Sequence, residues 1–374
     1  MFKKLVKIVL LTCVSAGPLA IVSSSADACT RILWADSKSQ CLLVGRTLDW
    51  QVDIQSNLWM FPRGMVRESL IHHDNPLVWT SKYASIIASA YDIASLDGLN
   101  EKGLAGHMLW LNEADYGQRH ANLPAMSVSY WLQYYLDNFA TVSEALTYTQ
   151  AHPYELWPVY FSPEKSWVKF HLALEDASGD SAIIEIVNGK TTVYHGSNYK
   201  VMTNSPVYSA QLQNIKHYQG LGGQQNLPGS TVSADRFARA TYYTSVLQTP
   251  ASSAAARYAL ESVLNNVTEP MENPALTGKR VSPTYWYSII DLTTKTYYFK
   301  YLKNPSWIWV SFNDFNVQAG APVMMLNTAK QIGLSGDVSK DFKAVKAFIP
   351  FETPEGFLPS GTAQIGAAGA EKVK

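Results

Sequence analysis

Cys29 is the residue of this chain best placed to carry out chemistry. It follows Ala26-Asp27-Ala28, a small-x-small pattern typical of a signal-peptide cleavage site. Cleavage after Ala28 would make Cys29 the first residue of the mature chain, with a thiol and a free α-amino group on one residue. The thiol is a nucleophile, and an α-amine with an ordinary pKa of about 7.7–8.0 can accept its proton near neutral pH.

The chain around Cys29 predicts a β-hairpin. Residues 29–36 and 41–50 both have strand character, and the polar residues 37–40 between them read as the turn. In such a hairpin Cys29 lies opposite Leu48. The thiol therefore sits at the open end of the hairpin, beside the end of the second strand.

The same register brings two charged side chains near the thiol. Arg46 lies opposite Arg31, two residues from Cys29 and on the same face, and Asp49 lies level with the new N-terminus. A cation near the sulfur lowers the pKa of a thiol, and a carboxylate can bind an amine. From spacing alone, a surface arginine and a turn aspartate remain an alternative interpretation of this pair.

Cys29 has two further interpretations, as a disulfide partner and as a lipid anchor. Cys41 is its only possible partner in the mature chain, but the hairpin separates the two by on the order of 20 Å of strand, whereas a disulfide needs Cα atoms within about 7 Å. A lipid-modified cysteine also follows a signal peptide. The charged Asp27 disfavours that processing, which prefers a small uncharged residue two positions before the cysteine.

Residues 1–28 predict a secretory signal peptide, with three lysines followed by an apolar stretch. Its removal takes three lysines and one aspartate from a chain of zero net charge and leaves a charge of −2. That value suggests neither a nucleic-acid partner nor an anionic membrane surface. Beyond the leader no apolar run reaches transmembrane length, so we expect a soluble, secreted protein without membrane insertion, periplasmic if the host is Gram-negative.

Patterns typical of cofactor and metal sites are absent from the sequence. No GxGxxG, phosphate-loop, HExxH or GxSxG motif occurs. His72-His73 is the only histidine cluster, and adjacent side chains rarely point at one metal, so a surface loop is the better interpretation. We expect a small-molecule substrate, no cofactor and no metal.

Strand pairs and helical segments alternate along the chain. Alternating apolar patterns predict strands over 58–61, 83–90, 96–105 (strand, turn, strand), 168–175, 181–187, 191–195, 284–291 and 296–302. Helical spacing predicts helices over 125–149, with breaks near Asn138 and Thr141, and over 233–247 and 251–265. This order favours packed antiparallel sheets with helices outside over a parallel sheet. We expect one α+β domain over 29–358 and a flexible C-terminal tail over 359–374.

Five short motifs, in this order and at this spacing, resemble the choloylglycine hydrolase family of N-terminal nucleophile hydrolases, which holds penicillin V acylases and bile salt hydrolases. They are Cys29-Thr30, Gly45-Arg46-Thr47-Leu48-Asp49-Trp50, Asn100-Glu101-Lys102-Gly103-Leu104, Thr203-Asn204-Ser205-Pro206, and Leu227-Pro228-Gly229-Ser230 with Ser233-Ala234-Asp235-Arg236-Phe237. The resemblance implies an αββα sandwich, two antiparallel sheets face to face and covered by helices.

The resemblance also implies roles for individual residues. Cys29 corresponds to the family's nucleophile, and Arg46 and Asp49 to the arginine and aspartate that flank its thiol and amine. Asn204 corresponds to the asparagine that donates to the oxyanion of the tetrahedral intermediate, and Arg236 to an arginine near the nucleophile. On its own, Asn204 could equally be a turn residue before a proline.

Two features of this chain differ from the bile salt hydrolases and other Gram-positive members. Both resemble the Gram-negative branch of the family, which hydrolyses penicillin V and acyl homoserine lactones. Trp110 stands where bile salt hydrolases usually have an asparagine, and its backbone N–H can still serve the oxyanion. The segment from Pro206 to Leu227 is much shorter than in Gram-positive members, whose insertion there helps to assemble a tetramer. A homotetramer is still expected by resemblance, and a core tryptophan is the alternative interpretation of Trp110.

The expected activity is cleavage of a linear amide by an N-terminal cysteine. Trp50 and Trp110 are candidate walls of an aromatic-rich pocket, which favours a phenoxyacetyl or fatty-acyl group. Penicillin V acylase-like and N-acyl homoserine lactone acylase activities are both expected. A conjugated bile salt hydrolase is the alternative within enzymes, and a lipoprotein or binding module anchored through Cys29 is the alternative from another class.

Overall fold

The computed structural model describes residues 29–36, 41–69, 75–118, 122–161, 166–272, 281–328, 330 and 332–350. All candidate site residues lie within these ranges. The predicted signal peptide (1–28), the predicted tail (359–374) and the pair His72-His73 lie outside them.

A seven-stranded sheet carries Cys29. Its strand order is β16 (Val201–Met202), β1 (Cys29–Asp36), β2 (Cys41–Asp49), β17 (Thr284–Asp291), β18 (Thr296–Tyr301), β19 (Ile308–Ser311) and β21 (Gly336–Asp337). Neighbouring strands are antiparallel except β19 and β21. In β18 the side chains alternate, and Tyr297, Phe299 and Tyr301 are buried, which is typical of a strand with one face on the core.

A nine-stranded antiparallel sheet forms the second layer. Its order is β15 (Lys190–His195), β14 (Ser181–Val187), β13 (Phe170–Glu175), β8 (Ala105–Trp110), β7 (Ala94–Asn100), β6 (Ser85–Ala90), β3 (Leu58–Phe61), β20 (Val323–Leu326) and β22 (Lys343–Val345). Three short strand pairs lie outside the two sheets: β4 (Val66–Glu68) with β5 (Val78–Thr80), β9 (Ala125–Ser127) with β10 (Glu155–Trp157), and β11 (Tyr160–Phe161) with β12 (Ser166–Trp167).

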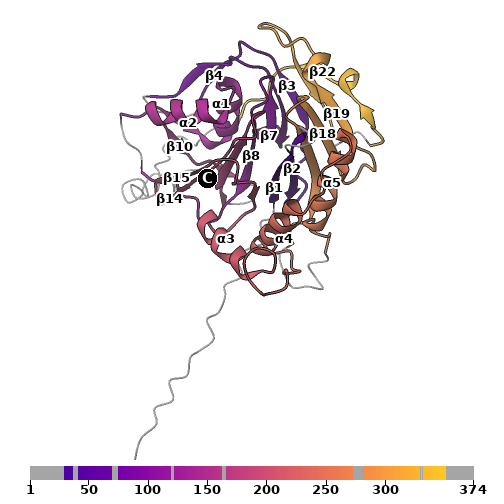
Figure 1. The fold of residues 1–374 in the computed structure, drawn as a ribbon. Helices are drawn as coiled ribbons and strands as arrows, with labels where there is room; N and C mark the ends of the chain where they lie inside the picture. The colour runs from indigo at the N-terminus through magenta and orange to yellow at the C-terminus, as the bar shows by residue number, and fades with distance from the viewer. Residues whose placement is uncertain are drawn as a thin grey trace, which may run out of the picture.

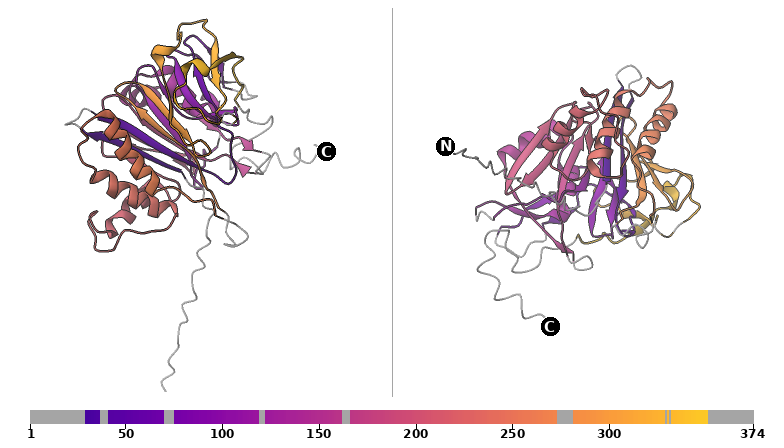
Figure 2. Two further views of the ribbon diagram at one scale, coloured as in Figure 1. Left: turned by 90° about the vertical axis from the view of Figure 1, so that its right-hand side faces the viewer. Right: turned by 90° about the horizontal axis from the view of Figure 1, so that it is seen from below.

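Helices cover the outer faces of both sheets, as Figures 1 and 2 show. Helix α1 (Trp131–Asn138) packs on β7 and β8 and is followed by α2 (Val142–Ala151). Helix α4 (Ser233–Ser245) packs on β1, α5 (Ser253–Asn266) on β2, and α3 (Tyr208–Asn214) against α4. The layers are therefore helix, sheet, sheet and helix, and the predicted αββα sandwich is confirmed.

The predicted hairpin at the N-terminus is confirmed in its register. Cys29 pairs with Leu48, Arg31 with Arg46, and Asp36 with Cys41. Neither Cys29 nor Cys41 forms a disulfide, so the disulfide interpretation is wrong for this structure. None of the described helices is long and apolar enough to cross a membrane.

The helix predicted over 125–149 needs correction. Its first residues form strand β9 and a 3-10 turn over Val128–Tyr130, and α1 begins only at Trp131. Ala125–Ser127 pairs with β10, and this long-range pairing overrides the local apolar spacing. The predicted second helix is confirmed, with the Thr141 hydroxyl accepting from the Glu144 N–H as its N-cap. Helix α3 and strands β19 to β22 were not predicted.

Candidate active site

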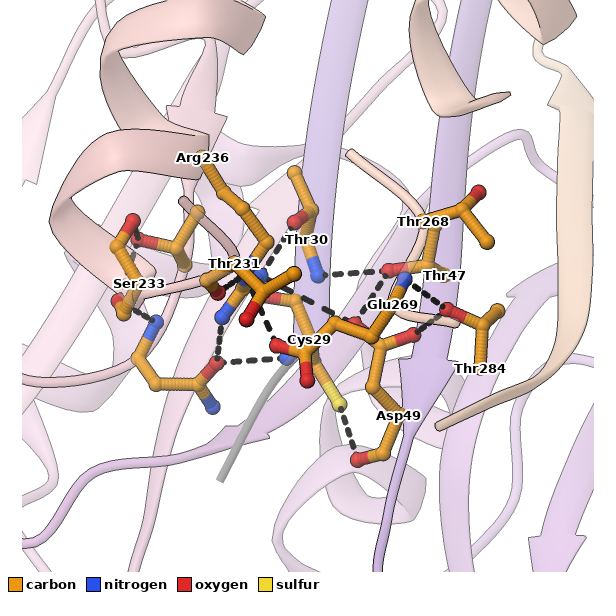
Figure 3. Close-up of polar contacts among 12 residues, drawn as sticks. Cys29, Thr30, Thr47, Asp49, Thr231, Ser233, Arg236, Thr268, Glu269 and Thr284 are labelled. Atoms are coloured by element: carbon orange, nitrogen blue, oxygen red, sulfur yellow. Dashed lines mark hydrogen bonds and ion pairs between the residues drawn. The ribbon is translucent and has the colours of Figure 1, made fainter. Parts of the chain in front are cut away.

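Cys29 begins strand β1 at the point where the two sheets and helix α4 meet, as Figure 3 shows. Its side chain is 3% exposed. In the unprocessed chain its nitrogen is a peptide nitrogen, and it occupies the position of the α-amine of a chain cleaved after Ala28. The contacts of this nitrogen therefore show which groups would face that amine.

The thiol lies between a carbonyl group and a guanidinium. Its sulfur donates to the backbone oxygen of Asp49 at 3.7 Å and lies 4.0 Å from Arg46 Nη2. Burial raises the pKa of the Cys29 thiol above its ordinary value, and the positive charge of Arg46 opposes this only in part. A thiol in this environment is protonated at neutral pH, so its nucleophilic form requires a nearby base.

Three contacts hold Arg46 next to the thiol. Its guanidinium donates to the carbonyl of Leu96 and, at 2.7 Å, to the carbonyl of Met108, and it lies 5.2 Å from the ring centroid of Trp286. Leu96 and Met108 belong to the opposite sheet, so the arginine crosses the core between the layers. The structure therefore places Arg46 near Cys29, as the hairpin register predicted.

Asp49 is buried at the end of β2 and has three polar partners. Its carboxylate accepts from the hydroxyl of Thr47 at 3.0 Å and from that of Thr284, and it lies 3.9 Å from Arg236 Nη1. Burial raises the pKa of Asp49 to about 6, against the lowering effects of Arg236 and the two hydroxyls. The carboxylate is therefore mostly ionised at neutral pH and readily protonated below that value.

Asn204 is the direct partner of the Cys29 nitrogen. Its Oδ1 accepts from Cys29 N at 2.6 Å and from Arg236 Nη2 at 3.1 Å. Its Nδ2 donates to the carbonyl of Trp110 at 2.8 Å. The predicted contact between a carboxylate and the amine is thus replaced by an amide oxygen, and Asp49 contacts Cys29 through its backbone carbonyl instead.

Arg236 joins helix α4 to the start of β1. Its Nη1 donates to the carbonyl of Cys29 at 2.8 Å and to the hydroxyl of Thr30 at 2.6 Å, and its Nε lies 3.4 Å from Glu269. These contacts fix the backbone of the nucleophile itself. The proximity to Cys29 that the sequence suggested is present, though the arginine meets the carbonyl and not the sulfur.

The backbone N–H and C=O of Trp110 point toward Asn204. Leu111 N donates to the carbonyl of Lys169, which immediately precedes β13. In the antiparallel pair of β8 and β13, the backbone N–H and C=O groups of residues 109 and 111 therefore point toward β13. Position 110 therefore turns its N–H and C=O the opposite way, and its carbonyl accepts from Asn204. A substrate oxygen between Asn204 Nδ2 and Trp110 N–H would meet two donors.

The supporting hydroxyls and amides of the site were not predicted as functional. Ser233 accepts from Asn204 N at 2.9 Å, and Gln211 donates to the Asn204 carbonyl at 3.3 Å. Ser233 and Thr47 lie inside the motifs that carry the family resemblance, so the sequence did contain a signal for these two site residues. Thr284 and Gln211 lie in no such motif, and only the tertiary structure brings them to the site.

An apolar cavity of about 90 Å³ opens on the thiol. Trp50 and Trp110 form part of its wall, with ring centroids 5.2 Å apart and planes tilted by 54°. Apolar residues make up most of the rest: Leu48, Ile54, Ala90, Ile93, Ala94, Leu96, Met108, Val128, Val159, Phe161, Val168 and Phe170. Arg46 is the one charged residue among the described lining residues. Among the described residues no group of His, Cys, Asp and Glu side chains is arranged to hold a metal.

Comparison with known proteins assigns this chain to a family. Residues 29–325 match the family model of the linear amide C-N hydrolases, choloylglycine hydrolase family. A penicillin V acylase of Pectobacterium atrosepticum is 34% identical over 353 residues, covering 88% of this chain and 94% of that protein. The structure of penicillin V acylase from Agrobacterium tumefaciens is similar with a TM-score of 0.77 and 35% identity, covering 86% of this chain and 99% of that one. A bile salt hydrolase/transferase of Clostridium perfringens is 22% identical and covers 75% of this chain and 92% of its own length.

Proposed function

This chain belongs to the choloylglycine hydrolase family of linear amide C-N hydrolases, and we propose that it cleaves amides of small apolar acyl groups, with penicillin V as its best test substrate. The proposal depends mainly on the cavity at Cys29. Its described lining is mostly apolar, and Arg46, the one charged residue among the described lining residues, is already bound by two backbone carbonyls. Such a surface favours an aryl or alkyl group over a charged one.

The size of the cavity separates candidate acyl groups. A cavity of ~150 Å³ holds one benzene ring in an engineered protein. At about 90 Å³, the present cavity is smaller than that, so it admits only part of an aryl or alkyl group and is much too small for a steroid nucleus. Penicillin V acylase activity is therefore favoured over bile salt hydrolysis. The apolar lining also suits the acyl chain of an N-acyl homoserine lactone, which is the second candidate substrate.

We propose that catalysis begins once residues 1–28 have been removed. The free α-amine of Cys29 accepts the thiol proton, and the thiolate attacks the acyl carbonyl carbon, forming a C–S bond. Asn204 Nδ2 and Trp110 N–H donate to the oxyanion, so Asn204 exchanges its bond to the Trp110 carbonyl for one to the substrate. The protonated amine then gives its proton to the leaving nitrogen as the C–N bond breaks.

Hydrolysis of the thioester completes the proposed cycle. Water attacks the acyl carbon with the Cys29 amine as base, and the C–S bond breaks to release the carboxylic acid and restore the thiol. Asn204 Oδ1 faces the amine throughout, at 2.6 Å from the nitrogen. Arg236 holds the Cys29 carbonyl at 2.8 Å, which keeps the nucleophile in place.

Initial rates on penicillin V, a long-chain acyl homoserine lactone and glycocholate test the substrate proposal. We expect measurable turnover of the first two and the lowest rate on glycocholate. Cys29→Ser should remove most of the turnover, whereas Cys41→Ser, a matched change of the other described cysteine that forms no disulfide, should leave it. A higher rate on glycocholate than on penicillin V would contradict the proposal.

The variant Trp110→Asn tests whether the Trp110 side chain decides between penicillin V and glycocholate. It keeps the backbone N–H and restores the side chain that bile salt hydrolases usually have at this position. We expect the ratio of the glycocholate rate to the penicillin V rate to rise. An unchanged ratio would mean that the indole of Trp110 does not decide between these substrates.

A further inference from the structure

A second cavity, of about 360 Å³, lies between the edge of the seven-stranded sheet and helices α3 and α4. Figure 1 shows these helices beside each other below β1. The cavity shares no lining residue with the one at Cys29. Its volume falls within the range of roughly 300–1,000 Å³ that is typical of small-molecule sites.

One side of this cavity is apolar and rigid. Trp34 of β1, Tyr208 of α3 and Phe237 of α4 are buried and line it. The rings of Tyr208 and Phe237 pack edge to face, with centroids 5.7 Å apart. Leu212 and Ile215 extend the same surface. An alkyl chain or an aryl ring would be removed from water there.

The lining also carries a charge. Lys200 is the one Lys, Arg, Asp or Glu among the described lining residues. Within the described parts of the chain, the structure shows no carboxylate at ion-pair distance from its ammonium group. The described lining therefore combines one positive charge with an apolar surface.

Thr244 adds an unsatisfied hydroxyl to the lining of this cavity. It is 8% exposed and lines the cavity, and its Oγ1 has no hydrogen-bond partner among the described residues. Its neighbours differ, because Thr241 donates to the Phe237 carbonyl at 2.7 Å and Ser245 to the Tyr242 carbonyl at 2.7 Å. A buried hydroxyl without a partner is costly, and a ligand oxygen would satisfy it.

We propose that this cavity is a second binding site, for an amphipathic monocarboxylate. The carboxylate pairs with Lys200 and accepts from Thr244, and its alkyl or aryl body packs against Trp34, Tyr208 and Phe237. One cation matches one negative charge, and the apolar share of the lining excludes a small hydrophilic anion. The proposal does not depend on the reaction at Cys29, since it follows from the lining alone.

Octanoate is the probe for the binding test, with the processed enzyme titrated by calorimetry. We expect Lys200→Gln to weaken this site by on the order of tenfold, as the loss of a hydrogen bond to a charged group does. The exposed Lys190→Gln is the matched control and should bind like the wild type. Equal binding by the wild type and Lys200→Gln would overturn the proposal.

Crystals soaked with 8-bromooctanoate locate the bound molecule, because bromine gives an anomalous signal. A peak among Trp34, Tyr208 and Phe237 supports the proposal, whereas bromine only in the cavity at Cys29 refutes it. Thr244→Val provides an independent check. It should bind octanoate more weakly yet unfold at the same or a higher temperature without ligand, since it removes an unsatisfied hydroxyl. A lower unfolding temperature would show that the hydroxyl serves the fold instead.

Discussion

Asn204 has two separate roles in the proposed mechanism. The peptide nitrogen of Cys29 and Arg236 Nη2 can only donate in this structure, so the amide oxygen must face them, and the NH₂ group is directed at the Trp110 carbonyl. The orientation of the amide is thus fixed by the chemistry of its three partners. In the proposed mechanism, its oxygen contacts the base and its nitrogen is the donor available for an oxyanion.

Substitution of Asn204 separates these two roles. Asn204→Asp keeps an oxygen acceptor toward Cys29 N and Arg236 but removes the NH₂ donor, whereas Asn204→Ala removes both. We expect Asn204→Asp to lose on the order of 10²–10³-fold in kcat, as loss of an oxyanion donor does, and Asn204→Ala to lose more, because it also removes the contact to the Cys29 nitrogen. Steady-state rates on penicillin V measure this. If Asn204→Asp keeps nearly full kcat, the amide is not an oxyanion donor.

Sequence reasoning reached the site residues by two different routes. Arg46 and Asp49 followed from strand register, because 17 residues separate Arg46 from Cys29 and one hairpin joins them. Asn204 and Arg236 lie far from Cys29 along the chain, and nothing local points them toward it. They were found only through a resemblance of motifs. Thr284 has neither signal, and its bond to Asp49 could be found only in the folded chain.

At the scale of elements, a chain of buried charges joins the two sheets beside the site. Arg31 of β1 pairs with Glu175 of β13, and His107 Nε2 lies 2.5 Å from Glu175 Oε1. His107 Nδ1 lies 2.6 Å from Asp97 of β7, whose carboxylate accepts from Tyr297 of β18 at 3.0 Å. Unpaired charges are costly in the core, so each member depends on its neighbours.

Stability should depend on pH through His107. Burial alone lowers the pKa of His107, but the carboxylates of Glu175 and Asp97 outweigh it and raise that pKa above its ordinary value. Its stabilisation is therefore complete below an unfolded pKa of about 6.5 and is lost as pH rises through the folded pKa. The pKa values of Asp97 and Glu175 are lowered despite burial, so their stabilisation is present above about pH 4–4.5 and is lost as pH falls through the folded values.

The variant His107→Gln tests this dependence. At pH 6 it should lower the free energy of unfolding by about 3 kcal/mol, because it leaves two buried carboxylates without their cation. As pH rises through the folded pKa of His107, the difference from the wild type should shrink, since the wild-type imidazolium is then lost. Urea unfolding over a series of alkaline pH values measures this change. A difference that stays the same at pH 6 and throughout the series would contradict the prediction.

Two glycines test how closely the elements pack. A Cβ at Gly98 of β7 would lie 2.6 Å from the backbone oxygen of Ile86 in the neighbouring strand, which cannot move aside. A Cβ at Gly45 of β2 would lie 3.1 Å from side-chain atoms of Leu260 and Leu264 in α5, which can. We expect Gly98→Ala to cost about 1–3 kcal/mol of unfolding free energy and Gly45→Ala clearly less. Equal urea midpoints for the two variants would contradict this.

Two physical causes explain elements that sequence reasoning missed. Helix α3 is only seven residues long, too short for helical periodicity to be recognised. Ala125–Ser127 has an apolar pattern compatible with a helix, and its strand conformation depends on pairing with Glu155–Trp157. The hairpins β1–β2 and β17–β18 were predictable because their pairing is local and their faces alternate. The α+β class followed from the order of strand pairs and helices, and the αββα sandwich from the resemblance of motifs.

At the scale of the whole molecule, the fold brings Asn204, Arg46 and Arg236 to Cys29 while the Cys29 nitrogen is still a peptide nitrogen. The proposed mechanism lacks only its base in this chain, because a peptide nitrogen at Cys29 cannot accept a proton from the thiol. We propose that residues 1–28 act both as an export signal and as a lock on activity. Under this proposal, cleavage changes the chemistry of one nitrogen and little of the architecture.

Two proteins that differ by one residue test this lock. One begins Met-Cys29 and the other Met-Ala28-Cys29, and removal of the initiator methionine leaves a free amine on Cys29 only in the first. Both should fold alike, with equal thermal unfolding midpoints, because the contacts of Cys29 N, Sγ and carbonyl are present in the longer chain. Only the first should turn over penicillin V, and intact mass should confirm each N-terminus. Full activity of a chain that retains Ala28 would refute the α-amine as the base, because its Cys29 nitrogen remains an amide.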